Sequence, residues 1–197
     1  MPRRIPLLLS LALLCGASAA SAQVGIEGSF GYLWPAGDAY EGVRGGTAFG
    51  AALSYVLPSE FRVSAGFLRA DFSLEDDESP DLTIERLAIP HWQVFLETSY
   101  VYRMFRRFQP YVGLRIGYDR ESADVEGTEI EAEGVGLSVV TGFDIVVFPV
   151  LSLNVSGFAG ISTFGDGEVA GERVEHSAYG GNLVGAAIGA RLALPRH

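Results

Sequence analysis

From Val24 onward the sequence alternates between large apolar residues and small or polar ones, and this period of two constrains the fold more than any other feature. Such alternation is typical of β-strands that have two different faces. Turn signals separate the alternating stretches from one another. The chain is therefore predicted to be all-β, with antiparallel strands over residues 24–34, 47–57, from 61, 91–103, 111–119, 134–145, 151–161 and 185–194.

The two faces of these strands indicate what surrounds them. In the first strand Phe30 and Trp34 lie on one face, while Ser29 and Gly31 lie on the other, and later strands repeat this contrast. An eight-stranded barrel is barely wide enough to hold side chains, so the large apolar residues cannot all point inward. An outward apolar surface of this extent is tolerated only in lipid. A transmembrane barrel is the favoured interpretation, and a soluble periplasmic lipocalin-like barrel that binds an apolar ligand is the alternative.

The connections between the predicted strands alternate in length. The short ones are 57–60, 105–110 and 148–150, and the long, mostly acidic ones are 35–46, 74–90, 120–133 and 164–178. Outer-membrane barrels have short periplasmic turns and longer extracellular loops. The pattern therefore predicts an eight-stranded antiparallel up-and-down transmembrane β-barrel with both ends in the periplasm.

The beginning of the chain has a pattern of a different kind. Two arginines precede an apolar run at 5–14, and the triplet Ala20-Ser21-Ala22 follows. A basic start, a short apolar run and an A-x-A site are typical of a secretory signal peptide. We expect cleavage near Ala22, which gives a signal peptide at 1–22 and a barrel domain at 23–197. The single cysteine, Cys15, lies in the removed part, so the mature chain is expected to have no disulfide, and no cofactor is predicted.

The mature chain is strongly acidic. The whole sequence has 14 basic residues, all of them arginine, against 24 acidic ones. Removing Arg3 and Arg4 with the leader leaves 12 arginines against 24 acids, which is a net charge of about −12. Such a chain lacks the basic surface that a nucleic acid requires, so no nucleic-acid partner is expected.

Isolated charges interrupt the small-residue face at middle to lower depth in the predicted barrel. Three acids and three arginines balance one another there: Glu27, Arg62, Glu97, Arg115, Asp144 and Arg191. Buried charges persist only when they are paired and hydrogen-bonded. We predict a network of salt bridges that fills the lumen and fixes strand register, with a gate or a narrow ion path as the alternative role of the same residues.

Aromatic residues gather near both ends of the predicted strands. Aromatic girdles at the two interfaces are typical of membrane barrels, although aromatic residues also favour strands in general. The predicted girdles comprise Trp34, Trp92 and Tyr118 toward the long loops, and Tyr55, Tyr100 and Tyr102 toward the short turns.

A lipid-modifying barrel enzyme is a further alternative, because such enzymes place a histidine with a serine and an acid at the loop end. The candidate sets are His91 with Ser79 and Glu85, and His176 with Ser177 and Glu175. Neither set places a nucleophile beside a base on a rigid element, so no catalytic residue is predicted. The three histidines of the chain have no spacing typical of a metal site, so no metal is predicted.

Two acidic runs, 75–78 and 129–133, lie in the predicted long loops. Such runs usually form solvated surface. They are also able to attract divalent cations that bridge them to lipopolysaccharide or to a surface partner.

With these strands, turns and leader, residues 24–194 resemble the small eight-stranded outer-membrane barrels of the OmpA/OmpX type. The resemblance concerns architecture and rests on no short motif. It implies an integral outer-membrane protein of a Gram-negative-type envelope, in contact with lipid and lipopolysaccharide. It also implies a non-enzymatic structural or surface-interaction role, and paired lumen charges like Glu27, Glu97, Arg115 and Arg191 are a recurring feature of that family. Eight strands leave little open space in the lumen, so at most a narrow pore is expected.

Overall fold

The computed structural model describes residues 23–37, 40, 42–74, 88–103, 107–125, 128–169 and 172–194. The predicted signal peptide and its cleavage site at Ala22 lie outside these residues. In the described part of the chain, no helix is long and apolar enough to cross a membrane.

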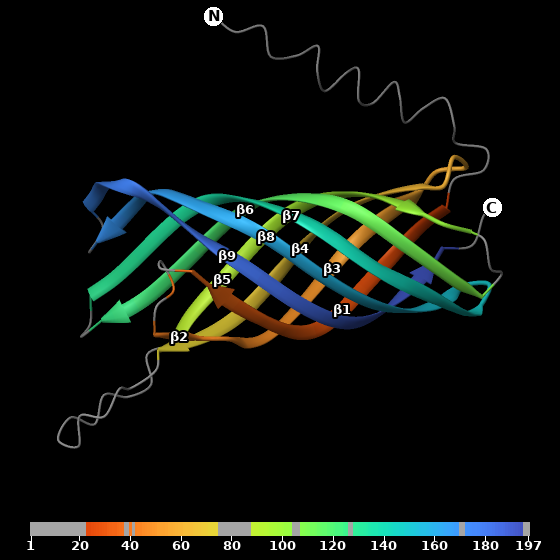
Figure 1. Cartoon of the computed structure of the whole chain (residues 1–197), viewed down its shortest axis with the longest axis horizontal. Coiled ribbons are helices and arrows are strands. Elements are labelled where there is room, and N and C mark those ends of the chain that lie inside the picture. The colour runs from red at the N-terminus through yellow and green to blue at the C-terminus, as the bar shows by residue number, and fades with distance from the viewer. Residues whose placement is uncertain are drawn as a thin grey trace, which may run out of the picture.

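The described residues form strands almost throughout (Figure 1). The strands are β1 (Gln23–Ala36), β2 (Val43–Arg44), β3 (Gly46–Val56), β4 (Phe61–Leu74), β5 (Ala88–Val101), β6 (Phe108–Val125), β7 (Thr128–Phe148), β8 (Leu151–Val169) and β9 (Glu172–Ala193). The two-residue strand β2 is an addition that pairs with the end of β4. The eight longer strands pair antiparallel with their neighbours, and β9 returns to pair with β1. The prediction of an eight-stranded antiparallel up-and-down barrel is confirmed.

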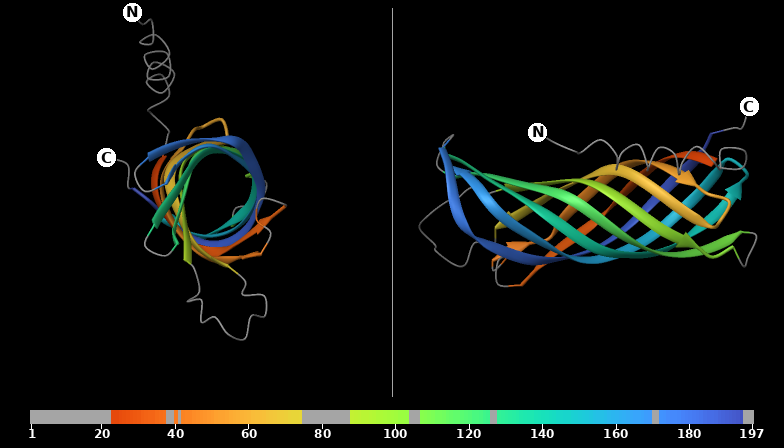
Figure 2. Two further views of the ribbon diagram at one scale, coloured as in Figure 1. Left: turned by 90° about the vertical axis from the view of Figure 1, so that its left-hand side faces the viewer. Right: turned by 90° about the horizontal axis from the view of Figure 1, so that it is seen from above.

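The pairing register determines the shape of the ring. One circuit starts at Gly25 and returns to Pro35, ten residues further along β1, through Ser54, Ser64, Glu97, Arg115, Ser138, Gly160 and Leu183. With eight strands, ordinary strand spacing and rise then give a tilt of about 41° and a backbone radius of about 8 Å. Seen along its axis, the barrel is a closed ring of tilted strands (Figure 2). Its interior is narrow enough for side chains from opposite walls to meet.

Side-chain exposure shows which face points outward. Large apolar residues of the alternating pattern are strongly exposed, with Leu53 at 61%, Val94 at 65% and Ile188 at 63%. Most of their neighbours in the sequence are small or polar, and these neighbours point inward. Water does not tolerate an apolar band of this size around a monomer, whereas lipid does. The prediction that the large apolar face points outward is therefore confirmed. The soluble-barrel alternative requires this face to line an internal cavity, and the exposures do not fit that arrangement.

Two of the predicted long loops are wrong. Residues 120–133 and 164–178 are mostly strand, because β6 and β7 continue to Val125 and Thr128, and β8 and β9 continue to Val169 and Glu172. The polar composition of these segments suggested loops. In fact the strand pairing set within the membrane continues beyond it, and the outer face of a strand in water carries polar side chains.

The exchange of the two faces is clearest along β4. Near the short turns its outward residues are apolar (Phe61, Val63, Ala65 and Phe67), and nearer the other end they are Arg69, Asp71 and Ser73. Its inward residues change in the opposite sense, from Arg62, Ser64 and Gly66 to Leu68, Ala70 and Phe72. We call the lipid-facing zone the belt. We call the opposite end of the barrel, formed by residues 69–74, 88–91, 119–125 and 128–133, the mouth.

Candidate functional site in the barrel lumen

Arg62 of β4 lies in the lower lumen with only 2% of its surface exposed. Its Nη1 donates to Asp144 Oδ2 at 2.9 Å, and its Nε donates to Ser99 Oγ at 3.3 Å. The guanidinium also lies over the ring of Tyr111, 4.3 Å from the centroid. Glu27 Oε1 is 4.0 Å from Nη1 on the remaining side. These contacts fix the guanidinium across the lumen rather than along the wall.

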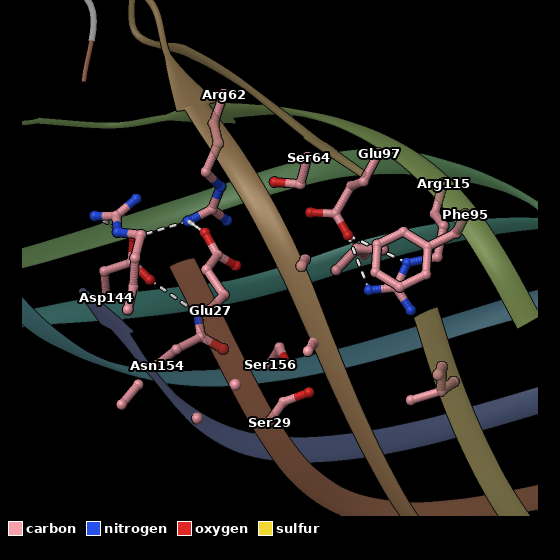
Figure 3. Close-up of a pocket in the computed structure, with 18 of the residues that line it drawn as sticks. Glu27, Ser29, Arg62, Ser64, Phe95, Glu97, Arg115, Asp144, Asn154 and Ser156 are labelled. Atoms are coloured by element: carbon pink, nitrogen blue, oxygen red, sulfur yellow. Dashed lines mark hydrogen bonds and ion pairs between the residues drawn. The ribbon is translucent and has the colours of Figure 1, made fainter. Parts of the chain in front are cut away.

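Asp144 of β7 is the centre of this part of the network (Figure 3). Its carboxylate accepts from Arg62, contacts Arg191 Nη2 at 3.3 Å and accepts from Asn154 Nδ2 at 2.8 Å. Asn154 also donates to the hydroxyl of Tyr111 at 2.9 Å. Both carboxylate oxygens of Asp144 are therefore used, and the side chain is fully buried. The network joins β4, β7, β8 and β9 across the barrel.

Glu97 and Arg115 form the second part of the network, one layer toward the mouth. They face each other directly in the β5–β6 register. Arg115 donates twice to Glu97 Oε2, from Nη2 at 2.9 Å and from Nε at 3.2 Å. Its guanidinium lies between two inward aromatic rings, 4.1 Å from the centroid of Phe95 and 5.2 Å from that of Phe158. Ser99 connects the two parts, because it accepts from Arg62 and donates to Glu97 Oε1 at 3.5 Å.

The structure thus brings all six predicted lumen charges into one group that is connected by ion pairs and hydrogen bonds: Glu27, Arg62, Glu97, Arg115, Asp144 and Arg191. The space left between them is a cavity of about 60 Å³. Two buried oxygens that have no hydrogen bond within the described residues, Glu27 Oε1 and Ser64 Oγ, belong to residues that line it. A polar cavity of this size accommodates a few water molecules and is too small for a larger solute.

The predicted girdle residues all face outward. Trp34, Trp92, Tyr118 and Tyr102 are exposed, and Tyr55 and Tyr100 are half-buried among their neighbours. At the short-turn end Tyr100 packs edge-on against Tyr102 at 4.7 Å and against Phe61 at 5.4 Å. At the mouth end the guanidinium of Arg69 covers the ring of Trp92 at 4.9 Å. Trp92 therefore lies where the outward side chains change from apolar to polar.

A further polar cluster lies at the base of the mouth and was not predicted. His91 is completely buried, and its Nδ1 is 3.1 Å from Glu121 Oε1. Asp119 is also completely buried, and it accepts from Gln93 at 2.7 Å and from Ser162 at 2.7 Å. The signal was present in the sequence, because these residues continue the inward positions of β5 and β6 beyond Glu97 and Arg115. Glu121 was missed because it falls in the segment that was predicted to be a loop.

The structure bears on the remaining candidates only in part. His91 contacts Glu121, while Ser79 and Glu85 lie outside the described residues. Glu175, His176 and Ser177 belong to β9, but their side chains lie outside what the structure describes. Among the described residues, no group of three or more histidine, cysteine or acidic side chains is arranged to hold a metal ion. The acidic run 75–78 is outside the described residues, and the run 129–133 lies in β7 rather than in a loop.

The model of the family described as "Outer membrane protein beta-barrel domain" matches residues 6–168. The chain belongs to this family. Its members are outer-membrane barrels, so the predicted family, fold class and outer-membrane association agree with the match. No curated protein has a significant sequence match to this outer-membrane barrel.

Solved structures with the same fold come from several bacteria. Neisserial surface protein A has a TM-score of 0.61 at 15% identity, with 87% of this chain and 98% of that one covered. OprG from Pseudomonas aeruginosa has a TM-score of 0.57 at 13% identity, with 89% and 97% covered. Ail, the attachment invasion locus protein of Yersinia pestis, has a TM-score of 0.54 at 11% identity, with 88% and 97% covered. At these identities the likeness concerns the fold.

Proposed function

We propose that this outer-membrane barrel is a non-enzymatic envelope protein whose lumen is closed to solutes and whose mouth takes part in surface interactions. In this proposal the signal peptide is removed near Ala22, both ends of the mature chain are periplasmic and the mouth is extracellular. The observation that supports it most strongly is the lumen network of Arg62, Asp144, Arg191, Glu97 and Arg115, which leaves a cavity of only about 60 Å³.

Each part of that network blocks passage for a physical reason. Arg62 and Asp144 come from β4 and β7 and meet across the lumen at 2.9 Å, so a solute would have to break this contact. Separating them removes the shortest ion pair that either charge makes, and breaking a buried pair costs several kcal/mol. Arg115 closes the next layer, because its guanidinium lies between the inward rings of Phe95 and Phe158. A backbone radius of about 8 Å leaves no second route beside these side chains.

Conductance in planar lipid bilayers tests the closed lumen. Residues 23–197 would be refolded, and folding would be verified by a shift of the detergent-gel band on boiling. The expected result is no resolvable single-channel steps for the natural sequence. The double variant Arg62→Ala with Asp144→Ala removes one charge of each sign and is expected to pass small ions. Long-lived ohmic steps from the natural sequence would overturn the proposal of a closed lumen.

Cell fractionation tests the location and the maturation. The full precursor would be expressed in a Gram-negative host, and its outer-membrane fraction would be extracted with detergent. Mass spectrometry of the intact protein is expected to give the mass of a chain that begins at Gln23. Recovery from the soluble periplasmic fraction, or a mass that retains the first 22 residues, would contradict the proposed processing.

Surface interaction is proposed to act through the outward acids of the mouth. Glu131 pairs with Arg120 on the outer face of the β6–β7 hairpin, and Glu133 is exposed beside it. These carboxylates are placed to share divalent cations with the phosphates of lipopolysaccharide. Magnesium-dependent binding of purified lipopolysaccharide is expected to weaken in Glu131→Gln with Glu133→Gln. Binding that does not depend on magnesium or on these residues would exclude this mode.

A further inference from the structure

The inner wall of the mouth is apolar and encloses a pocket of about 250 Å³. Val43, Phe72, Ile89, Ile130 and Ala132 contribute most of its lining. These residues occupy the inward positions of β2, β4, β5 and β7 at the mouth. Further down the lumen, most inward positions have charged or small residues instead. Ile130 is 38% exposed although it points inward, so the pocket opens to the outside.

One carboxylate interrupts this apolar wall. Glu121 lines the pocket and is only 8% exposed. Its Oε1 accepts from the Tyr40 hydroxyl at 2.8 Å and lies 3.1 Å from His91 Nδ1. Within the described part of the chain, Oε2 has no hydrogen bond. The carboxylate therefore has a fixed position and one oxygen left to accept from a ligand.

The groups that hold Glu121 are themselves fixed by packing. Tyr40 is 7% exposed, its N–H donates to Gly37 O at 3.0 Å, and its ring packs against Phe72 at 6.4 Å. The same ring lies directly against β9, where a Cβ on Gly181 would come within 2.1 Å of it. His91 packs against Phe72 at 5.6 Å. The polar end of the pocket is thus preorganised by its surroundings.

The charge balance indicates the sign of the ligand. In the lower lumen three arginines match three acids, whereas the described side chains of the mouth cluster comprise two acids, Asp119 and Glu121, and one histidine. His91 Nε2 is buried without a hydrogen bond and is 3.9 Å from Asp119 Oδ1. With two carboxylates against one imidazole, the cluster has no excess of positive charge even when the imidazole is protonated. A cationic donor is the group that best complements it.

Size and shape define the rest of the ligand. A buried apolar cavity of about 150 Å³ is able to bind benzene. A pocket of 250 Å³ accommodates a body of roughly ten non-hydrogen atoms by the same comparison. An apolar pocket with a few convergent polar groups is the usual form of a small-molecule site. We propose that the mouth pocket binds a small amphipathic amine, whose apolar body contacts Phe72, Ile89 and Ile130 and whose ammonium group pairs with Glu121.

This site is independent of the closed lumen, because the pocket lies on the mouth side of the buried His91–Asp119 layer. A protein that conducts ions could still bind the amine, and a protein with a closed lumen could fail to do so. Failure of one proposal is therefore distinguishable from failure of the other.

Calorimetric titration of the mature chain in lipid nanodiscs tests the proposal. The probe is tryptamine, with indole-3-propionate as a probe of the same ring and opposite charge, and empty nanodiscs as the blank. Saturable binding of tryptamine and no binding of indole-3-propionate are expected. Equal binding of the two probes, or a tryptamine signal no larger than that of empty nanodiscs, would overturn the proposal.

Two variants locate the binding in the pocket. Glu121→Gln keeps the size of the side chain and removes its charge, and tryptamine affinity is expected to fall at least tenfold. Ile130→Trp fills the pocket and leaves Glu121 in place, and binding is expected to be lost. Arg120→Gln, on the outer face of the same strand, is the matched control and should bind as the natural sequence does. If Glu121→Gln does not fold, as judged by the boiling shift, the contrast of the two probes and Ile130→Trp still decide the matter, and unchanged binding in Ile130→Trp would refute the site.

Discussion

The belt and the mouth are built from the same strands by the same alternation, yet their two faces are opposite in character. In the belt the outward row of β6 is Val112, Leu114, Ile116 and Tyr118, and the inward row includes Arg115. A few residues further along the strand, Arg120 points outward, while Ala123 lines an apolar pocket. The backbone geometry is continuous across this change. The comparison teaches that the surrounding solvent, rather than the strand, decides which face of a β-barrel is apolar.

The two zones also stabilise their interiors differently. The lower lumen depends on ion pairs, because every inward charge there has a partner within about 4 Å. The upper lumen contains a buried apolar cluster that includes Leu33, Ala70, Phe72, Phe164 and Leu183. We therefore expect substitutions of charged residues to lower the free energy of unfolding most in the lumen below the mouth. Four variants test this, and they are given from the largest expected effect to the smallest.

Asp144→Ala is expected to be the most damaging of the four. It removes the carboxylate shared by Arg62 and Arg191, which leaves one guanidinium beside Glu27 at 4.0 Å and the other without a described acid. The free energy of unfolding should fall by about 3–5 kcal/mol. Urea titration of the refolded protein, followed by tryptophan fluorescence, measures it. Ser152→Ala, at another buried lumen position, is the control; a similar loss in both would mean that the ion pairs are not what holds this layer.

Leu114→Arg is expected to follow. Leu114 is 54% exposed in the middle of the apolar outward row of β6. An arginine placed near the centre of a bilayer costs roughly 2–4 kcal/mol in a membrane barrel. The same titration in lipid vesicles measures the loss. A change in the free energy of unfolding below about 0.5 kcal/mol would be the size of an ordinary surface effect. It would mean that the outward row of β6 faces water, and that the belt does not include Leu114.

Arg115→Ala is expected to lower the free energy of unfolding by about 2–3 kcal/mol, because Glu97 then lacks its counter-charge inside the lumen. The loss is smaller than for Asp144 because Arg115 keeps 13% exposure and has a single acidic partner. Its neighbour Leu114→Val, which faces lipid, is the control and should change stability by less than about 0.5 kcal/mol. Equal unfolding midpoints for the two variants would refute the importance of the network.

Arg120→Leu should have the smallest effect. Its pair with Glu131 is exposed on the outer face of the mouth, and exposed ion pairs contribute about 0–1 kcal/mol. Urea titration is expected to give a midpoint close to that of the natural sequence. A loss as large as that of Leu114→Arg would show that the mouth does not differ from the belt in the way described.

Much of the belt could be predicted from the sequence, because alternation within lipid leaves one consistent assignment of faces. Phe95, Val101, Val140 and Phe158 fall on the small-residue face, and all four are buried, with exposures of 8%, 2%, 1% and 8%. The pairing of Glu97 with Arg115 follows from direct opposition on adjacent strands. The contact of Arg62 with Asp144, which are 82 residues apart, depends on the tilt of the ring, and periodicity along one strand does not give this quantity.

The mouth could not be predicted in the same way. Its strands have polar outward and mixed inward residues, so residues 120–133 read as an acidic loop although β6 and β7 pair there without interruption up to Val125 and Thr128. Propensity alone disfavours strand for such residues. The tertiary context overrides it, since each hairpin is already aligned by the part of the strand that lies in the belt.

The first and last strands of the barrel, β1 and β9, pair with each other along one seam. It extends from Gly25 opposite Ala193 to Ala36 opposite Asn182. Until that seam forms, β1 and β9 each present an unpaired edge, and hydrocarbon offers no partner for its N–H and C=O groups. The stability of the barrel is therefore not proportional to the number of strands in place, because removing any one of the eight long strands creates two unpaired edges. We expect assembly in lipid to be all-or-none, with its rate limited by the meeting of residues about 170 positions apart, since contacts of such long range are slow to form.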